Sequence, residues 1–171
     1  RFGKQTIRTR RQRRQKLEAF AGPLLFEMPS GRDAQTEIDL ALCWKRDWLA
    51  ERGLSSRVID GGKTEALLRD ACANDTVRVG VLRTIDRVIA IEIGFTLQRN
   101  YAAYLGAFDP AFTRFSPGQE QMMRSIAWCF ENGFTRYDLM PPSDAYKTGW
   151  SDSIAPVRDH CVALSPLGAG Y

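Results

Sequence analysis

A loop with the composition of an anion-binding turn lies between two apolar segments of the chain. It runs from Phe108 to Gly118, contains Pro110 and Pro117, and joins an aromatic run to a long amphipathic segment. This order predicts a strand that enters a helix. A helix N-terminus leaves backbone N–H groups unpaired and carries partial positive charge, so the loop is a candidate cradle for a phosphate. The alternative is an ordinary strand-to-helix connection, because a loop of this kind is a weak signal.

A second candidate group is Glu92, which lies in the middle of a run with the alternation of a strand. Large apolar residues alternate there with small ones, so one face is apolar and the other is small, with one carboxylate at its centre. Partial burial on a sheet floor would raise the pKa of this carboxyl toward neutrality and suit it to general base catalysis. The alternative is an exposed glutamate on a solvated sheet face.

The histidine and cysteine content argues against a metal site. Cys43, Cys72, Cys129 and Cys161 are widely separated and form no CxxC pair, and His160 is the only histidine. Three of the cysteines have apolar neighbours, which fits reduced, buried thiols of a cytoplasmic protein better than a disulfide framework or a zinc site. A Ser-His-Asp or Cys-His mechanism would depend on that single histidine.

The overall composition is that of one soluble domain. The chain has 171 residues, of which 44% are hydrophobic and 26% charged, enough for one complete core. No apolar run approaches the ~20 residues that span a bilayer. The start lacks an initiator methionine and the apolar segment of a signal peptide. We therefore expect a cytoplasmic chain that forms the C-terminal half of a longer one.

The net charge of +4 has a local origin near the start of the chain. Six cations lie within nine positions: Arg8, Arg10, Arg11, Arg13, Arg14 and Lys16. Such a run can bind nucleic acid or anionic lipid, or it can be the solvated face of a helix. No aromatic residues interleave with the cluster, so nucleic acid is the less favoured partner.

The periodicity of the apolar residues predicts helices, strands and a tail. We expect a mostly exposed basic helix over 4–19, with Leu17 and Phe20 as anchors, and a helix over 63–73 with Ala66, Leu67 and Ala71 inward. The other expected helices are 33–52, with Trp44 and Trp48 in the core or a groove wall, and 118–132, with a turn or short helix over 144–150. The expected strands are 24–28, 77–82, 88–97, 101–108, 136–140 and 155–164, followed by a loose tail over 165–171.

This order predicts an α+β fold with a mixed, mainly antiparallel sheet. Three consecutive strands with short turns form a meander, and the last of them is followed by a helix and another strand. A strand, a crossover helix and a further strand imply a parallel pair, so helices should flank the sheet.

Several motifs occur in order along the second half of the chain: YLGAFDP at 104–110, FSPG at 115–118, WCFENG at 128–133, YDL at 137–139 and AYKTGW at 145–150. Together they resemble the acetyltransferase-like domain of the GNAT superfamily in cellulose-biosynthesis-associated proteins, a group related to the Fem-type aminoacyltransferases. The resemblance extends from the basic helix to about Trp150. It implies a GNAT fold in which 101–108 is the splayed central strand.

The resemblance also implies an acyl-CoA site whose pyrophosphate loop is 114–119. The residues expected to bind the donor are Phe108, Arg114, Phe115, Ser116, Pro117, Gly118 and Gln119. Arg114 fits the superfamily pattern Gln/Arg-x-x-Gly-x-Gly/Ala, whereas Pro117 and Gln119 occupy glycine positions. Because Pro117 removes one N–H donor, a different donor such as an aminoacyl-tRNA remains open.

Acyl transfer from a thioester to an amine needs a base, donors for the oxyanion and an acid for the leaving thiolate. The candidates are Glu92 or Asp138 as base, Tyr146 as acid and Lys147 as the partner of a charged group. Alternatively, Asp138 caps the following turn, while Tyr146 and Trp150 pack the last strand.

Three functions follow from these observations. The first is an N-acyltransferase that uses acyl-CoA on an amino sugar or another amine in exopolysaccharide metabolism. The second is Fem-like transfer from aminoacyl-tRNA, with the basic helix on the phosphates. The third is a catalytically silent GNAT-like module. A second GNAT-like domain or a second copy of the chain is a further expected partner.

Overall fold

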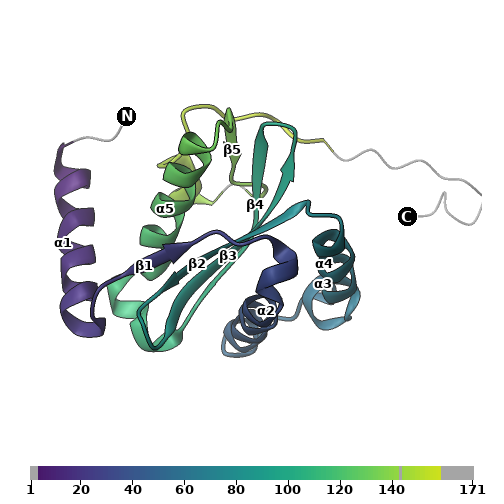
Figure 1. The fold of residues 1–171 in the computed structure, drawn as a ribbon, viewed down its shortest axis with the longest axis horizontal. Coiled ribbons are helices and arrows are strands. Elements are labelled where there is room, and N and C mark those ends of the chain that lie inside the picture. Colours follow the sequence, from purple (N-terminus) through teal and green to yellow (C-terminus); the bar gives the residue numbers. More distant parts are fainter. Residues whose placement is uncertain (1–3, 143, 159–171) are drawn as a thin grey trace, which may run out of the picture. The chain divides into compact units, whose positions relative to one another are not determined.

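The computed structural model describes residues 4–142 and 144–158 of the chain. The chain falls into two compact units, of which the first ends at Met140 and the second begins at Pro141. The first unit holds a five-stranded sheet and its helices (Figure 1). Its elements in order are α1 (Lys4–Ala21), β1 (Leu25–Glu27), η1 (Gly31–Ala34), α2 (Gln35–Ala50), α3 (Arg57–Asp60), α4 (Lys63–Ala73), β2 (Val77–Arg83), β3 (Val88–Leu97), β4 (Asn100–Phe108), η2 (Pro110–Phe115), α5 (Pro117–Glu131) and β5 (Arg136–Asp138).

The sheet has the strand order β1-β2-β3-β4-β5, so each strand pairs with its neighbour in sequence. The first three pairings are antiparallel, whereas β4 and β5 are parallel. A parallel pair needs a crossover connection, which η2 and α5 supply. The structure confirms the predicted α+β fold class, with a mixed, mainly antiparallel sheet flanked by helices.

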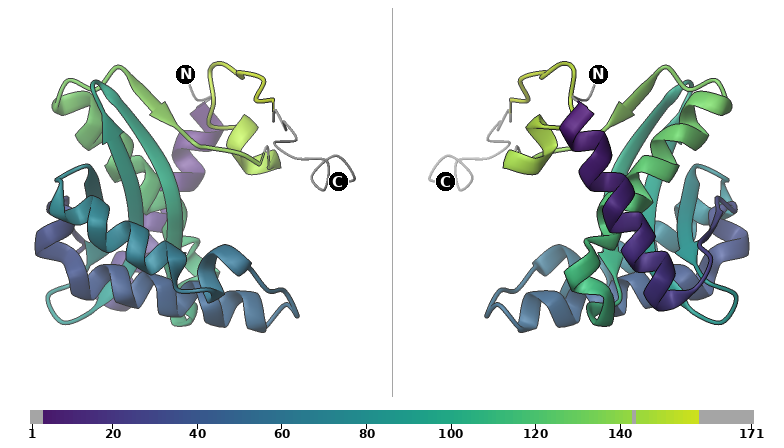
Figure 2. Two further views of the ribbon diagram at one scale, coloured as in Figure 1. Left: turned by 90° about the vertical axis from the view of Figure 1, so that its right-hand side faces the viewer. Right: turned by 90° about the vertical axis from the view of Figure 1, so that its left-hand side faces the viewer.

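Helices cover both faces of the sheet (Figure 2). Successive side chains of a strand point to opposite faces, and apolar side chains occur on both faces, where the helices bury them. On one face, α2 and α4 pack Ile38 and Leu68 against the strands in the larger core. On the other face, α5 lies against β2, β3 and β4. The smaller core lies near α1 and η2 and contains Leu17, Leu82, Ile89, Ala90 and Phe112.

The predicted helices and strands of this unit lie within two residues of their expected bounds, but two details differ. The short helix α3 was not expected. Helix α4 buries Thr64, Leu68 and Cys72, so the expected inward positions of Ala66 and Leu67 are wrong. A Cβ added at Gly31 would lie 2.6 Å from the Cys72 sulfur, so η1 packs closely on the side of α4 that carries Cys72. This contact turns the Cys72 side of α4 toward the core.

The two tryptophans of α2 differ in burial. Trp44 packs at the edge of the larger core, as expected. Trp48 is 36% exposed, and its ring lies 4.3 Å from the Lys45 Nζ and 4.1 Å from the Arg52 guanidinium carbon. Trp48 is therefore a surface residue that contacts one cation of its own helix, Lys45, and one just past the end of that helix, Arg52.

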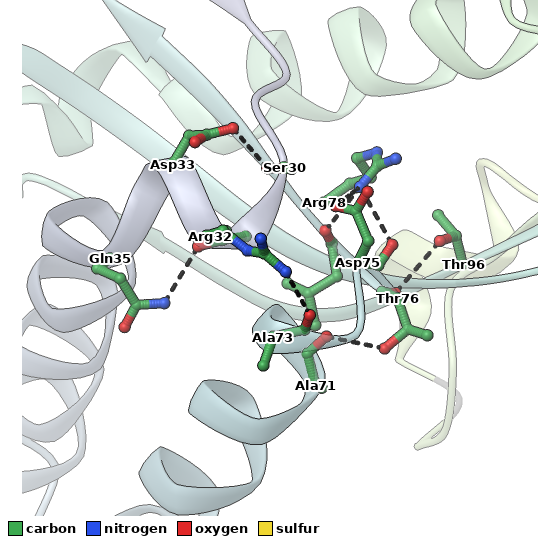
Figure 3. A network of polar contacts seen from close by, with 12 residues as sticks. Ser30, Arg32, Asp33, Gln35, Ala71, Ala73, Asp75, Thr76, Arg78 and Thr96 are labelled. Atoms are coloured by element: carbon green, nitrogen blue, oxygen red, sulfur yellow. Dashed lines mark hydrogen bonds and ion pairs between the residues drawn. The ribbon is translucent and has the colours of Figure 1, made fainter.

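A polar network joins the end of α4 to η1 and to the start of β2 (Figure 3). The Arg32 guanidinium donates to the Ala73 carbonyl at 2.6 Å, and the Thr76 hydroxyl donates to the Ala71 carbonyl at 3.0 Å. These bonds satisfy carbonyls that a helix C-terminus leaves unpaired. The network therefore fixes where α4 ends and β2 begins.

The second unit contains the short helix α6 (Ala145–Thr148). Residues 155–158 form no strand, so the expected strand over 155–164 is wrong in the part that the structure describes. The remainder of that strand, His160, Cys161 and the tail over 165–171 lie outside the described residues. Among the described helices of the chain, none is long and apolar enough to cross a membrane.

Candidate functional site

Strand β5 pairs along its whole length with the beginning of β4. The pairs are Asn100 with Arg136, Tyr101 with Tyr137 and Ala102 with Asp138. β4 then continues to Phe108, and in the described part of the chain no strand pairs with residues 103–108 on that edge. An open strand edge presents N–H and C=O groups to an extended ligand. This open edge of β4, over residues 103–108 past the end of β5, is called the fork below, and it is a place where an elongated molecule can add to the sheet.

The loop that follows β4 places the N-terminus of α5 beyond the end of this open edge. Ser116 adopts a left-handed conformation with φ of 53°, and Pro117 is the first residue of the helix. The Gln119 N–H donates to the Ser116 carbonyl at 3.0 Å. The Gly118 N–H has no acceptor among the described residues. Because Pro117 lacks an N–H, Gly118 is the donor that this loop offers to an anion.

Helix α1 contacts the same loop, which the sequence did not predict. The Arg13 guanidinium donates to the Gln119 side-chain oxygen at 3.0 Å. The Phe20 ring lies 5.2 Å from the Phe115 ring, and the Arg114 guanidinium lies 4.5 Å and 4.7 Å from these two rings. The basic helix thus forms a wall beside the predicted donor loop.

Glu92 is the centre of a buried polar cluster between the sheet and α5. It is 7% exposed, so the alternative of a solvated glutamate is wrong. The hydroxyl of Tyr101 donates to one carboxylate oxygen at 3.1 Å, and that of Tyr137 donates to the other at 2.7 Å. The Tyr101 and Tyr137 rings are stacked, with centroids 5.2 Å apart. Three strands therefore meet at one carboxylate.

Burial raises the pKa of the Glu92 carboxyl, while hydrogen bonds from Tyr137, Ser125 and Tyr101 oppose the rise. Burial and the charge of Glu92 also raise the pKa of both tyrosines, so their hydroxyls stay protonated as donors. Burial and the same charge raise the pKa of Cys129 to about 12. Because the thiolate is the reactive form, Cys129 is a poor nucleophile.

Two glycines leave room for the side chains of this cluster. A side chain on Gly94 would lie 2.1 Å from the Tyr101 ring, and one on Gly80 would lie 2.5 Å from the Gln121 amide nitrogen. The Gln121 amide donates to Ser125 at 3.3 Å. Glycine inside a strand can mark a close approach, so Gly94 was the signal in the sequence for a large group near Glu92.

Of the other predicted catalytic residues, Asp138 and Tyr146 are exposed, whereas the Lys147 side chain is 13% exposed. Asp138 is exposed at the fork, and its carboxylate accepts a hydrogen bond from the Met140 N–H at 2.8 Å, which matches the capping alternative. In the second unit, Tyr146 is 54% exposed. The Lys147 Nζ lies 3.8 Å from the Asp144 carboxylate and 6.0 Å from the Tyr146 ring. The structure thus brings Tyr146 and Lys147 together within α6.

The described residues contain no group of three or more His, Cys, Asp and Glu side chains that could hold a metal ion.

Comparison with known proteins supports this view of the fold. A family model of the acetyltransferase (GNAT) domain matches residues 4–148. A comparison with curated protein sequences finds no match.

Three solved structures show the same architecture at low sequence identity. An aminoglycoside acetyltransferase from an uncultured soil metagenomic sample, in complex with sisomicin, is 15% identical with a TM-score of 0.57, and the match covers 83% of this chain and 97% of that one. A putative acetyl transferase from Pyrococcus furiosus is 13% identical with a TM-score of 0.57, covering 81% and 100%. A predicted acetyltransferase from Clostridium acetobutylicum, solved with acetyl-CoA, is 12% identical with a TM-score of 0.55, covering 85% and 97%.

These structures establish the fold, and the family match covers most of the chain, including the fork, the loop and the Glu92 cluster. The chain belongs to the acetyltransferase (GNAT) domain family.

Proposed function

We propose that the protein is an N-acyltransferase that moves an acyl group from acyl-CoA to an amine. The observation that carries the proposal is the fork, whose open β4 edge leads toward the free N–H of Gly118. An extended donor with a thioester at one end and phosphates further along fits this order. The solved Clostridium acetobutylicum relative, which contains acetyl-CoA, supports the choice of donor.

Each residue of the loop has a separate proposed role in binding the donor. Gly118 would donate its N–H to the pyrophosphate at the positive end of α5. Arg114 adds charge beside the loop. Phe108 lies against Gly118, since a side chain at 118 would meet its ring carbon at 3.7 Å. The side chain of Gln119 is held by Arg13, so it shapes the loop rather than extending freely toward the ligand.

In the reaction, the amine attacks the thioester carbon, and the carbon–sulfur bond breaks as the thiolate leaves. The base takes the proton that the amine loses, and an acid returns one to sulfur. We propose Glu92 as the base, because burial raises its pKa toward the working range. Its oxygens are covered by tyrosine hydroxyls, so the proton would pass through Tyr137, whose hydroxyl takes one proton as it gives another to Glu92.

Asp138 is the competing base, since it is exposed at the fork and needs no relay. We propose Tyr146 as the acid and Lys147 as the partner of a charged group on the donor or acceptor. The proposed acceptor is an amine on a sugar, within exopolysaccharide metabolism. The aminoglycoside acetyltransferase relative supports the sugar-borne amine, because aminoglycosides carry amines on sugar rings.

A second candidate function is Fem-like transfer from an aminoacyl-tRNA. The observation that favours it is the hydrogen bond between Arg13 of the basic helix and Gln119 of the donor loop. Under this proposal, α1 would contact tRNA phosphates beside the reacting end. Removing the arginine cluster should then weaken RNA binding steeply and flatten its salt dependence.

Calorimetry with acetyl-CoA tests the proposed function. The acyltransferase should bind acetyl-CoA with measurable heat, and turnover of an amino-sugar acceptor should release free thiol. An absence of heat at millimolar ligand rejects the CoA-dependent enzyme. If tRNA also fails to bind, the silent GNAT-like module becomes the better description.

A further inference from the structure

An open surface hollow lies where α1 meets the donor loop. It has a volume of about 510 Å³ and is lined by Lys16, Ala19, Phe20, Arg114 and Phe115. We propose that this hollow takes the phosphorylated adenosine end of the acyl-CoA, with Lys16 on its 3′-phosphate. The inference rests on the proposed function and adds to it a nucleotide site built by α1.

The charges of the hollow are available to a ligand. Within residues 4–142 and 144–158, neither Lys16 nor Arg114 forms an ion pair with a carboxylate. Both side chains are exposed. Two cations beside one another without acidic partners create a positive potential that attracts a phosphate monoester.

The hollow also offers flat surfaces to a base. Phe20 is 56% exposed although its ring contacts Phe115 and the Arg114 guanidinium. Aromatic rings and guanidinium groups are flat and can stack on other planar groups. Nucleobases stack on such aromatic and guanidinium planes. Cations beside stacking planes are the chemistry that recognises a purine nucleotide with an added phosphate.

The hollow is continuous with the predicted donor loop. Arg114 precedes Gly118 by four residues, and the bond from Arg13 to Gln119 ties α1 to the first turn of α5. Lys16 lies three residues after Arg13, on the same side of the helix. A donor whose pyrophosphate contacts Gly118 would therefore extend its adenosine along this side of α1.

The test compares the affinities of acetyl-CoA and of its 3′-dephospho analogue by calorimetry. Wild-type protein should prefer acetyl-CoA by about 10-fold or more, the scale of one charge-assisted hydrogen bond. Lys16→Ala should lose this preference and bind the dephospho analogue as wild type does. The variant should fold, because Lys16 is exposed and alanine is a strong helix former.

Arg11→Ala is the matched control. Arg11 is exposed on α1 and lies five positions before Lys16, about 140° around the helix. The control should keep the preference for acetyl-CoA. An equal loss in both variants would mean diffuse attraction by the basic helix, and a preference retained in Lys16→Ala would also overturn the inference.

The outcomes separate this inference from the proposed function. If wild type binds neither nucleotide, the CoA-dependent function fails and the inference fails with it. If acetyl-CoA binds but the 3′-phosphate has no effect, the function stands and the inference alone is wrong. Binding of uncharged tRNA that depends on Lys16, without binding of acetyl-CoA, would assign the hollow to RNA.

Discussion

At the scale of single residues, the Glu92 carboxylate has both oxygens engaged by tyrosine hydroxyls. A proton that moves from a substrate amine to Glu92 would therefore pass through one of these hydroxyls. Tyr137 is the better candidate for that path, because it lies half-buried in β5 at the edge of the sheet, while Tyr101 is fully buried. Because the two tyrosines differ in burial, substituting each one separately distinguishes a proton relay through Tyr137 from a purely structural cluster.

We expect Tyr137→Phe and Glu92→Gln to lower kcat by similar factors, about 10² or more, with little change in the Kd for acetyl-CoA. Each change removes one part of the same proton path but leaves the donor loop intact. Steady-state kinetics with an amine acceptor, together with calorimetry, measures both quantities.

Tyr101→Phe is the matched control, since it removes the other hydroxyl from Glu92 and keeps the ring. It should retain most of the activity. If Asp138 is the base instead, Asp138→Asn alone should lower kcat, and Tyr137→Phe should be nearly silent. Full activity in both Glu92→Gln and Asp138→Asn would remove both carboxylates as bases.

A substitution at Gly118 can place a negative charge at the predicted anion site. Gly118→Asp should weaken acetyl-CoA binding by about 10²-fold, because a carboxylate would occupy the place of the pyrophosphate. The fold should persist, since acidic residues stabilise a helix N-terminus by about 0.3–1 kcal/mol. Calorimetry and the thermal midpoint measure the two effects.

Gly118→Ala is the control for the added side chain. A Cβ at 118 meets its nearest neighbour, the Phe108 ring, at 3.7 Å, which is ordinary contact. We expect nearly native affinity from this variant. Unchanged affinity in Gly118→Asp would show that the phosphates lie elsewhere.

At the scale of elements, α1 depends on few buried groups. Leu17 is 1% exposed in the smaller core, whereas Ile7 on the same helix is 55% exposed. We expect Leu17→Ala to lower the free energy of unfolding by about 2–4 kcal/mol through the lost burial and the cavity.

Ile7→Ala should change the free energy of unfolding by about 0.5 kcal/mol or less. Denaturant unfolding measures both variants. A small effect of Leu17→Ala would mean that α1 detaches locally before the sheet unfolds, and enhanced proteolysis of α1 would then accompany it.

The helices and strands that were predicted well are those whose own residue pattern is enough to identify their type and bounds. The alternation in β2 and β3 and the 3.6-residue period of α5 give both type and bounds. The inward face of α4 was misjudged because Leu67 and Leu68 are adjacent and equally apolar. The choice between them depends on the approach of Gly31 to Cys72, which is a contact between distant segments.

Only part of the candidate site could be predicted, because some of its features are local in sequence while others depend on contacts between distant segments. Glu92 and the loop to Gly118 stand out in the sequence, but the partners of Glu92 come from β4 and β5. Their meeting depends on strand register, including an irregularity between Ile93 and Gly94 that alternation does not show. The contact of α1 with Gln119 likewise joins residues 106 positions apart.

At the scale of the whole molecule, the buried Glu92 cluster links the stability of the fold to pH. The folded state holds the proton of Glu92 more strongly than the unfolded state, because burial raises the folded pKa above the ordinary value of 4.5. Stability must then fall as pH rises, since the folded state binds more protons. The stabilising contribution is present below the unfolded pKa and is lost as pH rises through the folded pKa.

Glu92→Gln should remove this dependence, because glutamine is uncharged at every pH and similar in shape to the protonated acid. We expect the two proteins to have similar free energies of unfolding near pH 4. The variant should become the more stable one as pH rises, by about 1.4 kcal/mol for each unit by which the folded pKa exceeds the unfolded value. Denaturant unfolding of both proteins at a series of pH values gives this difference, in which the other titrating groups largely cancel. Parallel curves would mean that the tyrosine hydroxyls fully offset burial. In that case, the pKa of Glu92 is the same in the folded and unfolded states, and at neutral pH Glu92 is a carboxylate held by the hydroxyls that were proposed to carry its proton.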